Sequence, residues 1–341
     1  MTSSLAEIVD ALSSSKPLAE GALHHAFASI LRGEWTPAQA ASFATALRIT
    51  GESSDVVVAG VVAMREAMIA VDHGLPLLFD TCGTGGDGRG TLNVSTIAAI
   101  IVSACGVPVA KHGNRSVSSR AGSADFIEAL GLPIELSIER HQSLLRTIGI
   151  TFLFAPAFHP ALRHVAQTRR ELGFRTVFNA LGPLCNPARA THQLVGVYSD
   201  ALLDIAASAF AKLGTTRAWV VRSEDGLDEI SPAARTHVRV VESGLVTHKV
   251  ISPATFGLPE APLEVLAGGD AADNVAIALE ILGGKHHPAR NAVALNAAAS
   301  LTVASGDAPR LCAAQALDAL DSGRALQLLE RWKREANRGL A

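Results

Sequence analysis

The sequence predicts an α/β protein in which a small all-helical domain precedes a larger α/β domain, where helices flank a mostly parallel central sheet. Apolar residues recur at helical spacing through the first seventy residues, and no strand pattern appears before Leu75. After Leu75, short apolar runs alternate with helical periods, which is typical of parallel strands joined by crossover helices. We therefore assign residues 1–72 to the helical domain and residues 73–341 to the α/β domain.

Helix start and stop signals punctuate the first domain. Ser and Thr at helix starts accept backbone N–H groups, and Gly commonly ends a helix. The signals are a capping box at Ser4 and Glu7, a start at Thr36–Pro37, a stop at Gly51, and a start at Ser53 or Ser54 of a helix that runs to Ala70.

The second domain is read as strands and helices in alternation. Strands are predicted at 75–79, 107–110, 151–155, 193–198 and 217–221. Helices are predicted at 95–105, 123–130, 160–172 and 202–213. A hairpin formed by 237–241 and 245–251 extends the sheet, and three helices fill 274–339.

Composition excludes several classes of protein. The chain carries 29 basic and 32 acidic residues, a net charge of −3, with no basic run, so nucleic acid is not an expected partner. Its longest uncharged stretch, 91–110, contains polar residues, glycine and proline and predicts a buried helix plus strand, not a membrane span. The N-terminus lacks a signal-peptide pattern, and the four cysteines form no CxxC pair. A reducing cytoplasm is the expected location.

A glycine-rich segment, Asp80–Thr96, lies between an apolar run and a predicted helix. A turn of this kind exposes backbone N–H groups at the positive end of a helix dipole, which favours phosphate. The segment matches neither GxGxxG nor GxxxxGK[ST], and Asp87 lies among its five glycines. A carboxylate would repel bare phosphate but suits a ribose hydroxyl or a metal-linked water, so a phosphorylated sugar is the favoured ligand. A plain structural turn is the alternative.

Two further polar segments follow predicted strands. Lys111–Asp125 offers three cations, an asparagine and four serines, whereas Ser223–Ser231 carries four carboxylates. Ligands of open α/β sheets bind beyond the carboxyl ends of the strands, so these segments are expected to face one crevice. Magnesium held by one or two carboxylates and substrate phosphates fits the acidic segment, and solvated surface loops are the alternative for both.

With these segments the chain resembles the anthranilate phosphoribosyltransferase family over almost its whole length. The matching signatures are GTGGD at 83–87, NVST at 93–96, KHGNR at 111–115, GSAD at 122–125, HPALRHVAQTRRELGFRTVFNALGPLCNPA at 159–188, GLDEIS at 226–231 and NAAA at 296–299. The resemblance implies transfer of a phosphoribosyl group from phosphoribosyl pyrophosphate to anthranilate, and an active site between the domains. It also implies a homodimer through the helical domain, which helices from about 160–190 join.

The resemblance also implies roles for individual residues. Phosphoribosyl pyrophosphate would be bound by Gly83, Gly86, Asp87, Thr91, Asn93, Val94, Ser95, Thr96, Lys111, Asn114, Ser119 and Ser123. Anthranilate would be bound by Gly83, Asn114 and Arg169. Two Mg²⁺ ions per subunit are expected, with Ser95, Asp228 and Glu229 at the metal positions.

The chain departs from the family pattern at Phe158, Cys185 and the Arg222–Ser223 pair. No general base is assigned, because an aromatic amine is already neutral near pH 7 and needs no strong base before attack; His112 is read as a structural residue. Two other functions remain open from the sequence. A pyrimidine nucleoside phosphorylase would have a lysine in the glycine-rich loop, which is absent here, and a non-catalytic nucleic-acid-binding relative is disfavoured by the net acidity.

Overall fold

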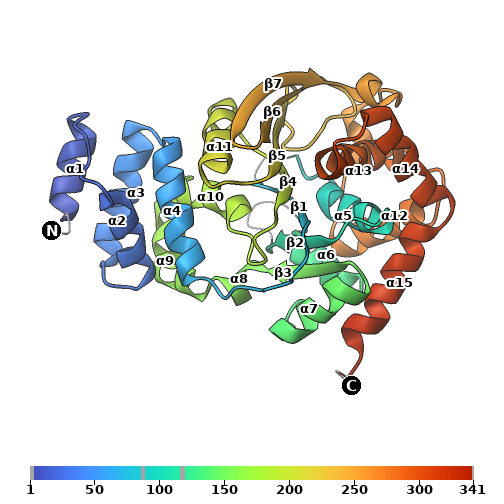
Figure 1. Cartoon of the computed structure of the whole chain (residues 1–341), viewed down its shortest axis with the longest axis horizontal. Coiled ribbons are helices and arrows are strands. Elements are labelled where there is room, and N and C mark those ends of the chain that lie inside the picture. The colour runs from blue at the N-terminus through green and yellow to red at the C-terminus, as the bar shows by residue number, and fades with distance from the viewer. Residues whose placement is uncertain (1–3, 86–88, 116–119, 340–341) are drawn as a thin grey trace.

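A seven-stranded sheet forms the centre of the molecule in the computed structural model, which describes residues 4–85, 89–115 and 120–339. The strands lie in the order β3-β2-β1-β4-β5-β6-β7. Neighbours from β3 to β5 pair in parallel, and β5, β6 and β7 pair antiparallel. Figure 1 shows α1 to α4 at one end of the long axis and α13 to α15 at the other. The predicted fold class is confirmed.

The first four helices are α1 (Leu5–Ser13), α2 (Ala22–Leu31), α3 (Pro37–Thr50) and α4 (Ser54–Ala67). The capping box at Ser4 and Glu7 is present, and the Thr36 and Ser53 side chains cap α3 and α4 as predicted. The last of these helices ends at Ala67, three residues before its predicted end.

The strands are β1 (Phe79–Gly83), β2 (Val109–Gly113), β3 (Ile150–Phe154), β4 (His192–Gly196), β5 (Arg217–Ser223), β6 (Thr236–Glu242) and β7 (Leu245–Ile251). The prediction for β1 was wrong in its bounds, because the strand only begins at Phe79 and continues into the glycine-rich segment. Pro76 in the apolar run has no N–H to donate to a ladder. Asp80 and Thr81 are polar yet buried, so an apolar-run criterion misses them.

The second domain contains α5 (Val94–Ala104), α6 (Ser123–Ala129), α7 (Ile138–Thr147), α8 (Ala155–Phe158), α9 (Arg163–Leu172), α10 (Val177–Leu181), α11 (Asp200–Lys212), α12 (Ala271–Leu282), α13 (Arg290–Ser305), α14 (Pro309–Asp321) and α15 (Arg324–Asn337). Four helices, not three, occupy the C-terminal third, since Gly306 at φ 82° ends α13 and Pro309 starts a separate α14. The helix α7 was not predicted.

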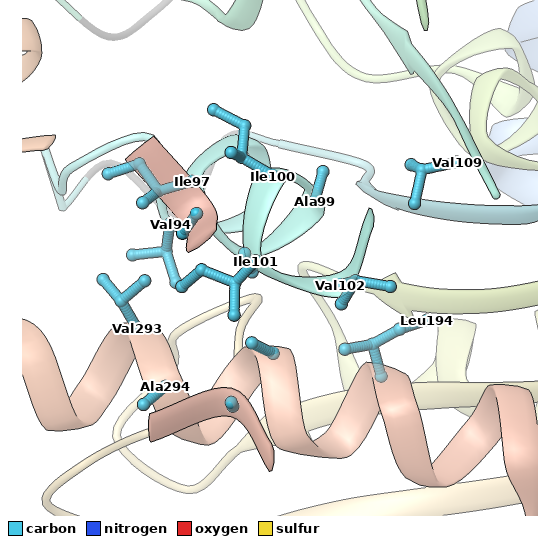
Figure 2. Close-up of a cluster of buried hydrophobic side chains, with 14 of the residues drawn as sticks. Val94, Ile97, Ala99, Ile100, Ile101, Val102, Val109, Leu194, Val293 and Ala294 are labelled. Atoms are coloured by element: carbon cyan, nitrogen blue, oxygen red, sulfur yellow. The ribbon is translucent and has the colours of Figure 1, made fainter. Parts of the chain in front are cut away.

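Helix α5 is buried between the sheet and α13. Figure 2 shows Ile101 and Val102 on the side of α5 that faces α13, the helix that carries Val293 and Ala294. Nine of the eleven α5 residues are buried, which explains its nearly continuous apolar sequence. The helix that leaves the glycine-rich segment is therefore fixed rigidly in the core.

The helical domain packs against α9, α10 and α11, and α11 covers the opposite face of the sheet at β5 and β6. A second hydrophobic cluster joins α2, α3 and α4 to α9, α10, α11 and the side chains of β4 and β5 that point away from α5. The Phe27 ring contacts Phe43 and Phe178 edge to face, with centroids 5.2 and 5.7 Å apart. No helix of the described ranges is long and apolar enough to cross a membrane. The domain boundary at residue 72 stays a prediction.

Candidate active site

The site lies where the strand order reverses. Successive strands β1, β2 and β3 proceed toward one edge, whereas β4 lies on the other side of β1. Open α/β sheets bind ligands in the crevice beyond the carboxyl ends of the strands at such a point. Gly83 ends β1 and Gly196 ends β4, and these two glycines are partners in the ladder.

The acidic segment Ser223–Ser231, here called the acidic loop, begins at the last residue of β5 and folds back over both glycines. A Cβ atom added at Gly196 would lie 1.5 Å from the Asp228 carbonyl oxygen, and one added at Gly83 would lie 3.0 Å from Oδ2 of Asp228. Only residues without a side chain allow this approach. The Asp228 carboxylate therefore lies at the carboxyl end of β1, where the glycine-rich segment begins.

Polar side chains hold the acidic loop in its conformation. The Ser223 hydroxyl donates to the Glu229 carbonyl at 2.7 Å and accepts the Ser231 N–H at 3.1 Å. The Asn296 amide donates to the Ile230 carbonyl and accepts the Ile230 N–H, each at 3.0 Å. Asn296 is 1% exposed, so the first asparagine of the NAAA signature acts as a buried support for the loop.

The described ends of the glycine-rich segment contact the acidic loop and β4. The Thr84 N–H donates to the Gly196 carbonyl at 2.9 Å, and the Thr84 hydroxyl accepts the Tyr198 N–H at 3.1 Å. The Arg89 guanidinium donates to the Asp225 carbonyl. The described ends of the segment therefore lie at the end of β1 and beside the loop after β5.

The glycine-rich segment leads into the N-terminus of α5. Its N-cap, Asn93, makes no side-chain cap, because the Asn93 amide donates to the Ala121 carbonyl and accepts from the Asn274 amide at 3.0 Å. Ser95 is half-buried in the first turn. The Thr96 hydroxyl is buried without a hydrogen-bond partner in the described chain. A helix N-terminus without a side-chain cap beside an unpartnered hydroxyl suits an oxyanion ligand.

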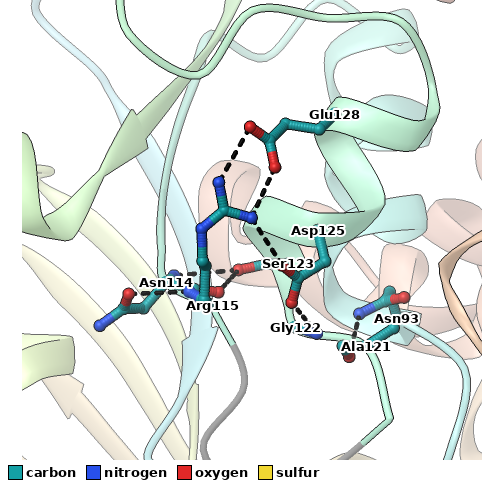
Figure 3. A network of polar contacts seen from close by, with 8 residues as sticks. All are labelled: Asn93, Asn114, Arg115, Ala121, Gly122, Ser123, Asp125 and Glu128. Atoms are coloured by element: carbon teal, nitrogen blue, oxygen red, sulfur yellow. Dashed lines mark hydrogen bonds and ion pairs between the residues drawn. The ribbon is translucent and has the colours of Figure 1, made fainter.

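The segment after β2 is fixed by α6, as Figure 3 shows. The Ser123 hydroxyl accepts the Asn114 N–H at 3.1 Å and donates to the Asn114 carbonyl at 3.2 Å. Arg115 forms ion pairs with Asp125 and Glu128 at 2.8 and 2.6 Å. Of the residues predicted here, Ser123 therefore supports Asn114, and the predicted phosphate contact of Ser123 stays untested.

Lys111 and His112 are both buried. The Lys111 ammonium donates to the Thr81 carbonyl, and its residue is 3% exposed. Burial lowers the pKa of His112 to about 3, assisted by the neighbouring His159 and Lys111 and opposed by a hydrogen bond to the Gly182 backbone. The His112 and His159 rings lie 5.3 Å apart, and Nε2 of each has no partner in the described ranges. His112 is thus a neutral group near pH 7.

Arg169 lies on α9, which packs against the helical domain. Burial lowers the pKa of its guanidinium, although the residue is only half-buried. Within the described ranges, no carboxylate forms an ion pair with Arg169. A half-buried cation of this kind suits a carboxylate ligand.

The three departures from the family pattern are accommodated. Ser223 anchors the acidic loop, and Arg222 pairs with Asp200 at 3.1 Å and donates to the Tyr198 carbonyl. The Phe158 ring packs on His141 with centroids 5.3 Å apart. Cys185 is fully buried against Met64.

Three predicted site residues, Gly86, Asp87 and Ser119, lie outside the described residues. The structure places the others in several groups. Gly83 and Asp228 meet at the carboxyl end of β1, and Glu229 follows in the acidic loop. Thr91, which bridges to Ala267, is followed by the start of α5 with Asn93, Val94, Ser95 and Thr96. Asn93 contacts Ala121 in the segment after β2, to which Asn114 and Ser123 also belong. Lys111 is buried in β2, and Arg169 lies on α9. In the described part of the chain no cluster of three or more His, Cys, Asp or Glu side chains is placed to hold a metal. Sequence reasoning missed Asn274, whose only signal is an asparagine within an apolar helical pattern.

Comparison with known proteins defines the class. Residues 75–326 match the family described as glycosyl transferase family, a/b domain, and residues 6–68 match its helical bundle domain. The chain belongs to this family of two-domain glycosyl transferases.

Individual relatives narrow the class. The anthranilate phosphoribosyltransferase of Moorella thermoacetica is 47% identical over 92% of this chain and 94% of its own. The structure of the Thermus thermophilus anthranilate phosphoribosyltransferase has a TM-score of 0.90 at 42% identity, covering 96% of this chain and 99% of that one. The Saccharomyces cerevisiae anthranilate phosphoribosyltransferase in complex with PRPP and Mg has a TM-score of 0.89 at 30% identity, covering 98% of both chains. Within the glycosyl transferases, this chain is therefore a member of the anthranilate phosphoribosyltransferases.

Proposed function

We propose that this protein transfers the 5-phosphoribosyl group of phosphoribosyl pyrophosphate to the amine of anthranilate, releasing pyrophosphate, as a step of tryptophan biosynthesis. The observation that carries the proposal is the meeting, beyond β1 and β4, of the acidic loop with the described ends of the glycine-rich segment, which leads into α5. Such a site offers backbone N–H groups for the phosphates and carboxylates for a cation that bridges them.

Separate groups of residues are proposed to bind the two substrates. Gly83, Thr91, Asn93, Val94 and the hydroxyls of Ser95 and Thr96 are proposed to bind phosphoribosyl pyrophosphate, together with Gly86, Asp87, Lys111, Asn114, Ser119 and Ser123. Gly83, Asn114 and Arg169 are proposed to bind anthranilate. The α5 N-terminus stabilises negative charge as pyrophosphate leaves C1 of the ribose. The amine needs no base before attack, in keeping with the neutral and weakly basic His112.

The donor set fits Mg²⁺, with two ions per subunit proposed. Ser95, Asp228 and Glu229 supply oxygen ligands only, which magnesium prefers, and substrate phosphates would complete the coordination. When bound, the ions would neutralise charge on the departing pyrophosphate. Equilibrium dialysis with phosphoribosyl pyrophosphate measures the number of ions, and a single bound ion would contradict the proposed stoichiometry.

Heat protection tests the binding part of the proposal. Phosphoribosyl pyrophosphate is expected to raise the melting temperature only with Mg²⁺ present, because Asp228 and Glu229 would otherwise repel the pyrophosphate. Replacing both residues by Ala is expected to reduce turnover at least about a hundredfold. Equal protection in the presence of a chelator, or near-normal turnover of the double variant, would contradict the metal assignment. Phosphorolysis of thymidine would instead favour the nucleoside phosphorylase.

A homodimer is proposed on the resemblance, not on the apolar valines of α4. One chain already buries Val57 and Val61 completely, so these side chains give no support for a partner subunit. Support comes from two exposed apolar side chains. Ile49 near the end of α3 is 78% exposed, and Phe174 after α9 is 42% exposed. Light scattering at micromolar concentration is expected to give twice the mass of the chain, and a monomer mass would refute the dimer.

A cytoplasmic location is also proposed. All four cysteines are free thiols, as expected in a reducing compartment. Recovery of the native protein in the periplasmic or secreted fraction would contradict it.

A further inference from the structure

The two loops proposed to bind phosphoribosyl pyrophosphate leave neighbouring strands that separate at their carboxyl ends. Strands β1 and β4 pair at five positions, from Phe79 to Gly83, and β2 and β3 also pair at five. Between β1 and β2 the ladder pairs only Phe79 with Val109. Beyond that position the backbones of β1 and β2 no longer satisfy each other, so other groups must fill the gap.

Buried polar side chains fill it. One carboxylate oxygen of Asp80 accepts the His112 N–H at 3.1 Å, and the other accepts from the Asn186 amide at 2.8 Å. The Lys111 ammonium crosses in the opposite direction and donates to the Thr81 carbonyl. Asp80, Lys111 and Asn186 are 0%, 3% and 2% exposed. These three side chains form what we call the polar wedge between β1 and β2.

The wedge reaches a third segment. Asn186 also donates to the Ala110 carbonyl and accepts the Ala188 N–H, each at 2.8 Å. The preceding turn, Gly182–Leu184, is held from the helical domain by Arg65, whose guanidinium donates to the Leu184 carbonyl at 2.8 Å. Asp80 therefore connects β1 and β2 to a third segment, which is also hydrogen-bonded to the helical domain through Arg65.

Charge makes the arrangement specific. Burial raises the pKa of Asp80, while Lys111 and the hydrogen bonds from Asn186 and His112 oppose that rise. Removing one of two buried, opposite charges leaves the other uncompensated. Asn186 cannot simply reverse its amide, since that would break its bonds to Ala110 and Ala188.

We propose that Asp80 is a positioning residue that sets the spacing between the glycine-rich segment and the KHGNR loop. It touches neither substrate and acts through His112, Lys111 and Asn186. The proposal rests on the proposed function, because the spacing matters only if both loops bind one phosphoribosyl pyrophosphate.

Steady-state kinetics of Asp80 variants tests the proposal. Asp80→Asn places an amide N–H₂ against the Asn186 amide, so the gap must widen. A misplacement of about 1 Å at an active site costs about a hundredfold in rate, and a loss of at least that size in kcat/KM for both substrates is expected.

Two controls separate positioning from plain stability. Thr151→Val removes a buried hydrogen bond to His141 on the neighbouring strand β3 and is expected to lower the melting temperature without changing either KM. Asp80→Glu keeps the charge and the acceptors but is longer by one methylene, so it tests spacing in a folded protein if Asp80→Asn fails to fold. Wild-type constants for both substrates in either folded Asp80 variant would overturn the proposal. So would an Asp80→Asn effect on stability alone.

Hydrogen exchange distinguishes an error in the proposed role of Asp80 from an error in the proposed function. The His112 amide is expected to exchange faster in Asp80→Asn than in the wild type or in Thr151→Val, whatever the substrate is. If the wild type shows no turnover but exchange changes as expected, the function is wrong and the wedge stands. Unchanged exchange at His112 would overturn the wedge.

Discussion

Replacing Gly196 by alanine is expected to inactivate the protein by displacing the acidic loop. The new Cβ would lie 1.5 Å from the Asp228 carbonyl oxygen, whereas ordinary contacts begin near 3.4 Å, so about 2 Å of movement is required. Strand β4 pairs with β1 and β5 at this position and cannot retreat. The acidic loop must therefore move, and Asp228 moves with it.

The expected magnitudes follow from that displacement. A shift of this size at reacting groups costs about a hundredfold or more in kcat/KM. Forcing a methyl into a packed site costs about 1–3 kcal/mol of unfolding free energy. The Mg²⁺ concentration for half-maximal rate is expected to rise as well, since the Asp228 carboxylate leaves its place beside Gly83.

Steady-state rates over a range of Mg²⁺ concentrations, with urea unfolding in parallel, make the test. Gly60→Ala is the matched control, because its Cβ would crowd only the flexible ends of Leu181 and Phe27 in the helical domain. This control is expected to lose stability while its Mg²⁺ dependence stays normal. Wild-type rate and Mg²⁺ dependence in Gly196→Ala would refute the placement of the acidic loop.

Three further predictions concern single residues. Arg169→Ala is expected to raise the KM for anthranilate about tenfold, or roughly 1.4 kcal/mol, and Arg169→Lys to restore only part because lysine lacks the two-pronged geometry; unchanged constants in the alanine variant would refute the assignment. Asn296→Ala leaves the Ile230 N–H and carbonyl unsatisfied, so the free energy of unfolding in urea is expected to fall by about 2 kcal/mol or more and kcat to fall as well. Unchanged stability and kcat would show that the acidic loop does not need this support. Burial lowers the pKa of His112, His141 and His159 to about 3, 4 and 4, so these groups stay neutral when folded but take up protons near pH 6.5 when unfolded. Stability is therefore expected to fall as pH drops from about 6.5 toward 4, by up to about 1.4 kcal/mol per histidine per pH unit, in urea unfolding at several pH values; a flat profile would contradict the burial of these rings.

Periodicity was sufficient for much of the fold. The apolar alternation after Leu75 predicted the parallel sheet, and caps at Ser4, Thr36 and Ser53 predicted helix starts that the structure confirms. Most of β1 was missed because Asp80 and Thr81 are polar and are buried only through contacts with distant segments. Such burial depends on partners that a local pattern does not contain.

The candidate site also combines segments that the local sequence reveals with residues whose role depends on distant partners. Glycine-rich and acidic segments could be identified from local composition, and the strand alternation brought them to one edge of the sheet. The supports could not be identified in this way. Asn274, Asn186 and Asn296 bridge residues that are 181, 106 and 66 positions away in the chain. An asparagine whose partners are far along the chain looks like an ordinary polar residue, and its role emerges only when the fold brings the partners within hydrogen-bond distance.

The most direct measurement of the central claim is product stoichiometry with the purified protein. Anthranilate consumption, followed by its fluorescence, and pyrophosphate release would be recorded together after mixing with phosphoribosyl pyrophosphate and Mg²⁺. We predict one pyrophosphate released for each anthranilate consumed, with neither change when phosphoribosyl pyrophosphate or Mg²⁺ is omitted. Anthranilate left unconsumed by a folded protein that binds phosphoribosyl pyrophosphate, or pyrophosphate released without loss of anthranilate, would contradict the proposed transfer.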